Sequence, residues 1–358
     1  MKRILFTGEL PMGSINGVAI SNGININILK TKFSVSQIVE RVEEPKYKGA
    51  HLEKITFNFN RVLSIILITL KYKFNFFYLV YSNSKAGALK TYLLMLAFKL
   101  FGQDAKIIVH LHRGDIKRQL NSLIGKSLFK LNLRLIDKFI VLSDADLNFL
   151  ENNYGKQKTQ IIVLRNIINA SQYFKSKEQL SNNNKFIFIS NYIIEKGILD
   201  LLDSFSGMEK PLSLKCYGGY SGDIRPKDLA SYQSDNILIS GPIYGEEKFK
   251  AIYDADCLIL PSHNEGMPLI LLETMSLGVP FIARSVGHVR EMIYENYPFL
   301  YNRAEELGEM IQTFSSLSIT ERNALGKQVR DHYSANFDRS NHEKKMLSIF
   351  EHDLHNKW

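Results

Sequence analysis

Several features are scarce in this chain of 358 residues, and each absence removes a class of protein. There are two cysteines, Cys216 and Cys257, which lie far apart and match no metal-binding spacing. We expect both to be buried free thiols in a reducing compartment. No run of about 20 apolar residues is free of charge, as a membrane-spanning helix requires. The nearest candidate, residues 62–81, is interrupted by Lys71 and Lys73.

Other signals are also missing. The first residues form a short apolar run that ends at a glycine turn, without a long apolar region or a cleavage site, so we expect no signal peptide. No basic motif interleaved with aromatic residues appears, which argues against nucleic acid as a partner. His110 and His112 are spaced like a pair of metal ligands, but no third ligand follows nearby, and we expect no metal.

Charge is distributed unevenly along the chain. The net charge is +9, but residues 1–170 hold 25 Lys and Arg against 11 Asp and Glu, while the remainder holds 20 against 25. Such asymmetry indicates an anionic partner for the first half, either nucleic acid or an anionic membrane. The alternative is a basic face that merely keeps the protein in solution.

The prediction of a membrane partner depends on one predicted helix and the basic residues that follow it. Residues 86–101 mix large apolar side chains with Lys90 and Lys99, and Lys117, Arg118, Lys126, Lys130 and Arg134 follow. The apolar residues are typical of a helix that covers a sheet, whereas the basic ones suit a surface that meets lipid phosphates. We therefore expect a cytoplasmic protein, peripheral on the inner face of the plasma membrane.

Strand-like and helix-like segments alternate throughout the chain. In the first half, buried-strand runs occupy residues 3–7, 76–81, 106–111 and 139–142, and helical patterns occupy 18–29 and 86–101. Ser143 is placed as a helix N-cap, with Asp144 and Asp146 in the first turn, where negative charge suits the helix dipole. Alternation of this kind predicts an α/β fold with a parallel sheet covered on both faces.

A second unit of similar design follows. Residues 171–184 are polar and weakly patterned, which suggests a linker. Strands are then predicted at 185–190, 212–217, 236–240, 255–260 and 279–283, and helices at 197–205, 246–254 and 269–277. Two such units make a cleft, and ligands of open α/β sheets bind at the carboxyl ends of the strands.

The densest chemistry lies between residues 258 and 291. A hydrophobic strand runs into a polar loop, and Met267-Pro268-Leu269 then opens a helix whose first-turn amides suit a phosphate. Glu265 precedes this helix and Glu273 lies inside it, eight residues later. Because carboxylates accept hydrogen bonds from vicinal hydroxyls, the pair predicts a site for a ribose or a sugar ring.

This segment resembles glycosyltransferase family 4, the large retaining group with the GT-B architecture of two Rossmann-like domains whose parallel sheets face each other across a cleft. The run is P-S-x-x-E-G-x-P-L-x-x-L-E-x-M-x-x-G-x-P. The resemblance implies that Glu273 holds the ribose of the donor nucleotide and that Glu265 lies near the donor sugar. Gly266, Met267 and Leu269 then form the helix start that receives the diphosphate.

Further segments carry the same resemblance. Glu195-Lys196-Gly197 matches a family segment in which the lysine neutralises the donor diphosphate, as a departing diphosphate requires. The family's arginine shortly before this lysine is absent here. Arg113, Arg165, Arg284 or hydrogen bonds from Asn191 are the candidate replacements.

Two positions in the first half complete the predicted site. Gly17 stands in the loop after the first strand, where the family has a paired glycine close to the diphosphate, and Asn16 replaces one glycine of that pair. His112 matches a family histidine near the donor sugar, against the alternative of a structural histidine at a strand end.

These matches imply a retaining, metal-independent glycosyltransferase that needs no cofactor besides its nucleotide-sugar co-substrate. The acceptor is expected to be a lipid-linked or oligosaccharide hydroxyl of a bacterial surface polysaccharide. Residues 1–170 would bind the acceptor and residues 171–340 the donor, with a C-terminal helix at about 341–358 packing back on the first domain. A sugar-nucleotide epimerase on the same architecture and a non-catalytic nucleotide-sugar-binding partner remain the alternatives.

Overall fold

The computed structural model describes residues 1–11, 16–40, 51–101, 104–112, 116–155, 158–169, 177, 180, 183–208 and 212–351. The chain forms two compact units. Unit 1 comprises Met1–Asn166 together with the C-terminal segment from Arg339, and unit 2 comprises Ile167–Asp338. Most of the predicted linker, residues 171–184, lies outside the described residues.

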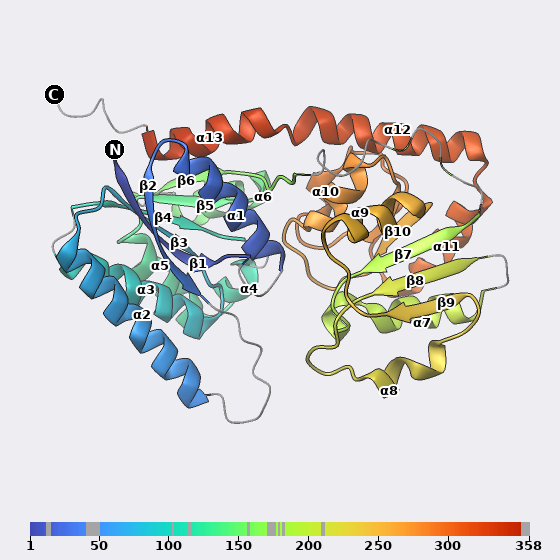
Figure 1. Cartoon of the computed structure of the whole chain (residues 1–358), viewed down its shortest axis with the longest axis horizontal. Helices are drawn as coiled ribbons and strands as arrows, with labels where there is room; N and C mark the ends of the chain where they lie inside the picture. The colour runs from blue at the N-terminus through green and yellow to red at the C-terminus, as the bar shows by residue number, and fades with distance from the viewer. Residues whose placement is uncertain are drawn as a thin grey trace. The chain divides into compact units, whose positions relative to one another are not determined.

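Unit 1 is built on a parallel sheet of six strands in the order β2-β1-β3-β4-β5-β6 (Figure 1). The strands are β1 Arg3–Glu9, β2 Ser34–Glu40, β3 Phe76–Val80, β4 Lys106–His110, β5 Lys138–Val141 and β6 Gln160–Val163. Central strands such as β3 are continuous apolar runs with almost every side chain buried. A parallel sheet requires such strands because helices cover both of its faces.

Helices α2, α3 and α5 pack on one face of this sheet, and α1 and α13 pack on the other (Figure 1). The helices of unit 1 are α1 Gly17–Lys30, α2 His51–Lys71, α3 Lys85–Leu100, α4 Ile116–Leu120, α5 Leu123–Leu133, α6 Asp144–Tyr154 and α13 Arg339–Glu351. Phe350 of α13 packs edge-on against Phe76 and Tyr78 of the sheet. The C-terminal helix therefore contributes to the core of unit 1, although it follows unit 2 in the chain.

Unit 2 has a second parallel sheet of six strands, in the order β12-β11-β10-β7-β8-β9. Its strands are β7 Lys185–Ile189, β8 Ser213–Tyr217, β9 Ile237–Ser240, β10 Cys257–Leu260, β11 Phe281–Arg284 and β12 Leu300–Tyr301. Counted within the unit this is the order 3-2-1-4-5-6 of a Rossmann sheet. The order in which successive strands are added to the sheet reverses between β7 and β10, and such a switch point is where open α/β sheets bind ligands.

The helices of unit 2 cover both faces of its sheet (Figure 1). They are α7 Ile198–Ser206, α8 Pro226–Leu229, α9 Gly245–Asp254, α10 Leu269–Ser276, α11 Leu307–Ser316 and α12 Ile319–Asn336. Short 3-10 helices occupy η2 Ile194–Lys196, η3 Ala230–Tyr232, η4 Val289–Met292 and η5 Ala304–Glu306.

Local sequence signals decide several of these boundaries. Ser143 caps α6 as predicted, because its hydroxyl accepts a hydrogen bond from the backbone N–H of Asp146 at 3.0 Å.

Cys216 and Cys257 are buried free thiols, also as predicted. The sequence signals gave no assignment for β2, α2, α5 or β6. Among the described helices, none has the length and apolar character needed to cross a membrane.

Candidate functional site

The loops that follow β7 and β10 bring Lys196 and Glu265 together. Lys196 lies in η2 after β7, and Glu265 lies in the loop after β10, at the switch point of the sheet. The Lys196 Nζ donates a hydrogen bond to the Glu265 Oε1 at 2.7 Å, and both side chains are largely withdrawn from solvent. Two residues that are 69 positions apart in the chain thus form one charged pair where a ligand is expected to bind.

Two glycines hold the Glu265 loop in place. Gly287 has a φ of +56°, and a Cβ at that position would lie 1.7 Å from the Glu265 carbonyl oxygen. Gly197 has a φ of +69°, and a Cβ there would lie 2.2 Å from the carbonyl oxygen of Pro261. Only glycine tolerates both the positive φ and such close backbone approach. The N–H of His288 also donates to the Gly266 carbonyl at 3.2 Å, which fixes the loop from the same side.

The loop leads directly into α10. The structure places Pro268 at the N-cap, so the helix begins at Leu269, and the Pro268 side chain makes no capping hydrogen bond. Met267 and Leu269 are buried, while Gly266 is half-buried. The first N–H groups of a helix carry partial positive charge and bind anions, so the sequence expectation of an anion site at this turn has the required backbone geometry.

Glu273, on the following turn of α10, is paired with a lysine that the sequence did not indicate. The Lys248 Nζ on α9 lies 2.6 Å from the Glu273 Oε1. Burial raises the pKa of Glu273, and the Lys248 charge opposes that shift. From the sequence, a lysine that follows two glutamates at a helix start is expected to be exposed. Only the packing of α9 beside α10 shows that this lysine has a partner.

The predicted replacements for the missing arginine are accounted for individually. Arg165 of unit 1 pairs with Asp144 at 2.6 Å. In unit 2, the Arg284 Nε donates to the Asn302 carbonyl at 3.0 Å, and Asn191 is exposed just after β7. Arg113 lies outside the described residues. None of these described contacts joins a second cation to Lys196, so Asn191 remains the nearest candidate in the sequence.

The other two predicted residues, His112 and Gly17, belong to unit 1. Gly17 opens α1, whose N-cap Asn16 accepts from the N–H of Ala19. His112 is buried, its ring lies 3.9 Å from that of His110, and burial lowers its pKa to about 3. It is therefore a neutral imidazole at physiological pH.

The hydrogen bonds of Asn22 fix the tautomer of His112. The Asn22 Nδ2 donates to the Glu9 carbonyl at 2.9 Å, which turns its Oδ1 toward the His112 Nε2, also at 2.9 Å. The His112 Nε2 therefore carries the proton, and the buried Nδ1 is an acceptor without a partner among the described residues. Such an atom accepts a hydrogen bond from a hydroxyl and repels a phosphate oxygen.

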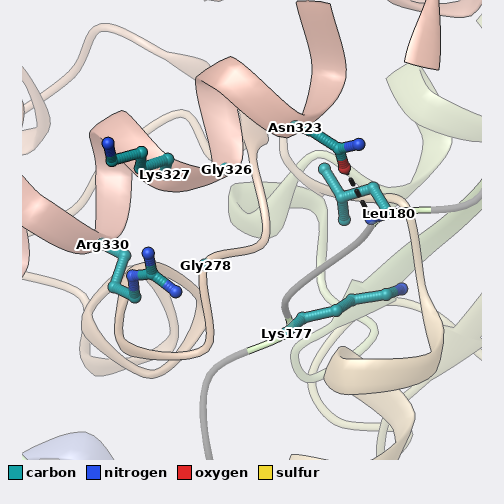
Figure 2. Close-up of a pocket in the computed structure, with 7 residues that line it drawn as sticks. All are labelled: Lys177, Leu180, Gly278, Asn323, Gly326, Lys327 and Arg330. Atoms are coloured by element: carbon teal, nitrogen blue, oxygen red, sulfur yellow. Dashed lines mark hydrogen bonds between the residues drawn. The ribbon is translucent and has the colours of Figure 1, made fainter. Parts of the chain in front are cut away.

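Figure 2 shows a small hollow in unit 2 that is not this site. Lys177, Lys327 and Arg330 line it, and the N–H of Leu180 donates to the Asn323 Oδ1 at its edge. Its volume of about 30 Å³ suits a water molecule, whereas ligand pockets span roughly 300–1,000 Å³. Within the described ranges, no cluster of three or more His, Cys, Asp or Glu side chains is arranged to hold a metal ion.

A known protein family is similar in sequence to most of unit 2. Residues 183–316 match the family model described as Glycosyl transferases group 1. The predicted resemblance is confirmed. The match contains Lys196, Glu265 and Glu273, so the similarity to this family and the charged pairs described above concern the same segment.

Curated relatives extend the similarity beyond this segment. An uncharacterised glycosyltransferase of Methanocaldococcus jannaschii is 24% identical over 69% of this chain and 68% of its own length. A Campylobacter jejuni enzyme named N,N'-diacetylbacillosaminyl-diphospho-undecaprenol alpha-1,3-N-acetylgalactosaminyltransferase is 22% identical over 58% of this chain and 57% of its own length. The chain thus spans a little over half the length of the second relative. Both relatives carry the name of a glycosyltransferase.

Solved structures confirm the α/β fold with two Rossmann-like units. Sucrose-phosphate synthase from Thermosynechococcus elongatus superimposes with a TM-score of 0.75 over 98% of both chains, at 15% identity. The Anabaena protein HepE in complex with UDP-glucose gives a TM-score of 0.73 over 98% of this chain and all of its own, also at 15% identity. At these identities the likeness establishes the GT-B fold.

Proposed function

We propose that the protein is a retaining glycosyltransferase that moves a sugar from a nucleoside-diphosphate sugar to a hydroxyl of a lipid-linked or glycan acceptor. The observation that carries this proposal is the meeting of Lys196 and Glu265 at the switch point, beside the start of α10. A positive side chain, the amides at a helix N-terminus and a carboxylate together suit a ligand with both a diphosphate and sugar hydroxyls.

Each group then has a role when the donor binds. Lys196 transfers its hydrogen bond from Glu265 to the diphosphate and stabilises the charge that develops as the glycosidic bond breaks. The released Glu265 accepts hydrogen bonds from the sugar hydroxyls, and Glu273 does the same for the ribose. Since the lysine and the helix amides supply the positive charge, the proposed reaction is metal-independent.

Retention follows if the acceptor attacks from the face that the diphosphate leaves. The acceptor hydroxyl then gives its proton to a diphosphate oxygen while its own oxygen bonds to the anomeric carbon, and the nucleoside diphosphate departs. Glu265 and Glu273 are therefore not proposed as the acid and base of a hydrolase.

The names of the relatives and structures support this choice of substrates. The Campylobacter jejuni relative is named for a sugar acceptor on diphospho-undecaprenol, and a structural neighbour is described with UDP-glucose. We accordingly propose a polyprenol-linked or comparable lipid-linked acceptor in surface-polysaccharide assembly, with the protein at the membrane surface that carries it.

A thermal-shift screen against UDP, GDP, ADP, CMP and TDP tests the donor site. A ligand at 100 times its dissociation constant should add about 2.7 kcal/mol to stability. Glu273→Gln should remove most of this gain, whereas Glu309→Gln, at an exposed glutamate of α11, should keep it. No stabilisation by any of the five nucleotides would contradict the proposed donor site.

A transfer assay then separates the three alternatives. Incubation of the matching nucleotide sugar with a lipid-linked acceptor should yield a product of unchanged anomeric configuration. Conversion of the nucleotide sugar to an epimer without any acceptor would identify an epimerase. Nucleotide binding without turnover on any of a panel of acceptors would favour the non-catalytic partner.

A further inference from the structure

Exposed apolar side chains gather on one part of unit 1. Of the seventeen large apolar residues that are exposed in the described part of the chain, eleven lie between positions 59 and 124. They are Phe59, Leu63, Leu67, Leu70, Tyr72, Leu89, Leu93, Leu100, Phe101, Leu123 and Ile124. Scattered apolar residues on a protein surface are ordinary, but a concentration on neighbouring helices marks an interaction site.

On α2 and α3 these residues form outward rows at helical spacing. Phe59, Leu63, Leu67 and Leu70 are 67%, 44%, 59% and 65% exposed, and successive members are three or four positions apart on α2. On α3, Leu89 and Leu93 are four positions apart and Leu100 follows after seven. The inward face of α3 is separately filled by buried residues such as Leu94 and Phe98.

Both helices are therefore apolar on the face that normally carries polar residues. A helix that covers one face of a sheet usually has one apolar stripe and a charged opposite side. Because α3 packs between α2 and α5, the rows and the exposed pair Leu123 and Ile124 belong to neighbouring helices on the same side of the sheet (Figure 1). We call these exposed apolar side chains of α2, α3 and the start of α5 the docking face.

The charge around the docking face has one sign. The sequence contains no Asp or Glu from position 54 to position 103, a run of 50 residues that includes seven Lys and Arg. Exposed lysines stand beside the apolar rows at Lys71, Lys73 and Lys85, and α5 adds Lys126 and Lys130. A surface that is apolar in its middle and positive around it is complementary to an anionic lipid headgroup layer above acyl chains.

We propose that the docking face binds the surface of an anionic bilayer, with α2 and α3 lying in the plane of the interface. The leucine side chains enter the boundary between headgroups and acyl chains, and the lysines contact lipid phosphates. A second copy of the chain fits this face less well. In a two-fold dimer the same patch would meet itself, and its lysines would face lysines, since positions 54–103 contain no Asp or Glu to pair with them.

Co-sedimentation of the whole protein with vesicles tests the proposal. Vesicles of phosphatidylcholine alone are compared with vesicles containing phosphatidylglycerol, at low and at high salt. The wild type should bind the anionic vesicles, and binding should weaken as salt rises because the headgroup attraction is screened. Vesicles without anionic lipid should bind at least roughly tenfold more weakly.

Two combined variants separate the apolar and the electrostatic contributions. Leu67→Gln, Leu70→Gln, Leu100→Gln and Leu123→Gln together remove the most exposed leucines, and Lys71→Gln, Lys73→Gln, Lys126→Gln and Lys130→Gln remove the charge. Each set should weaken binding by about tenfold or more. Leu238→Gln with Tyr244→Gln, which changes exposed apolar residues of unit 2, is the matched control and should bind as the wild type does.

Two results would overturn the proposal. One is a wild type that does not bind anionic vesicles at low salt, or that binds them equally well after the leucine changes. The other is a wild-type dimer that the leucine changes convert to a monomer without any vesicle binding, which would identify a second copy as the occupant. Circular dichroism and nucleotide binding, measured on the same variants, should be unchanged, so that this result stands apart from the test of the donor site.

Discussion

Lys248 and Glu273 form an ion pair between α9 and α10, in which the Nζ of the half-buried lysine lies 2.6 Å from the Oε1 of the buried glutamate. Glu273 is the residue proposed to hold the donor ribose. Burial by itself raises the pKa of Glu273, so Lys248 keeps this carboxyl closer to its ionised form. The lysine is therefore a positioning residue for the proposed ribose contact.

The first prediction concerns this pair. Lys248→Met should lower the free energy of unfolding by about 3 kcal/mol, because it leaves a buried carboxylate without its partner. The loss should shrink as pH falls and Glu273 takes up a proton. Chemical denaturation at several pH values measures it. Lys250→Met, at an exposed lysine of the same helix, is the control, and an equal effect of both changes would refute the role of the pair.

Lys196 should distinguish a diphosphate from a monophosphate. Lys196→Met should weaken binding of the matching nucleoside diphosphate by roughly 30-fold, the value of about 2 kcal/mol for a hydrogen bond to a charged group. Binding of the corresponding monophosphate should change little. Titration calorimetry compares the two ligands, with Lys227→Met of α8 as an exposed control. Equal losses for both ligands would place Lys196 away from the diphosphate.

Gly287 should not tolerate a side chain. Gly287→Ala introduces a Cβ that would lie 1.7 Å from the Glu265 carbonyl at a φ of +56°, so the loop must shift. We expect a loss of about 1–3 kcal/mol in stability and a larger proportional loss of transfer activity. Gly241→Ala is the control, because a Cβ at that position would meet no neighbouring atom within 4 Å. Thermal unfolding and an activity assay of both variants give the answer, and an active Gly287→Ala enzyme would contradict the loop's role.

The buried histidines of unit 1 should make the fold sensitive to acid. Burial lowers the pKa of His112 to about 3 and that of His342 to about 4, while the unfolded chain protonates near 6.5. The unfolded state thus binds protons first, and stability falls as pH drops from about 6.5 towards 4.

For His342 alone the loss over this range is roughly 3 kcal/mol. Urea denaturation between pH 7 and 4 measures the slope of stability against pH. His342→Gln should flatten this slope, whereas His332→Gln on α12, at a half-buried position of unit 2, should leave it unchanged. A slope that His342→Gln does not alter would assign the acid sensitivity to other groups.

Much of the site was accessible from the sequence because its signals are local. The loop with Glu265, the helix start at Leu269 and the turn at Lys196 each follow a recognisable buried strand, and all three were predicted. Lys248 was missed because its importance comes from a partner on another helix, 25 residues away in the chain. His112 was singled out, but its tautomer depends on Asn22, which is 90 residues away.

The sequence by itself determined the two α/β units, since apolar runs that alternate with helical patterns leave few folds other than covered parallel sheets. It also determined the order of acidic and basic residues in the candidate donor site. Only the tertiary structure decided that β7 lies beside β10, which brings Lys196 to Glu265, and that the leucines of α2 and α3 stay exposed. The reason is physical: the spacing of residues shows which of them share a face of a helix or follow a strand. Which strands pair, and whether another element covers a helix face, depends on contacts between segments far apart in the chain.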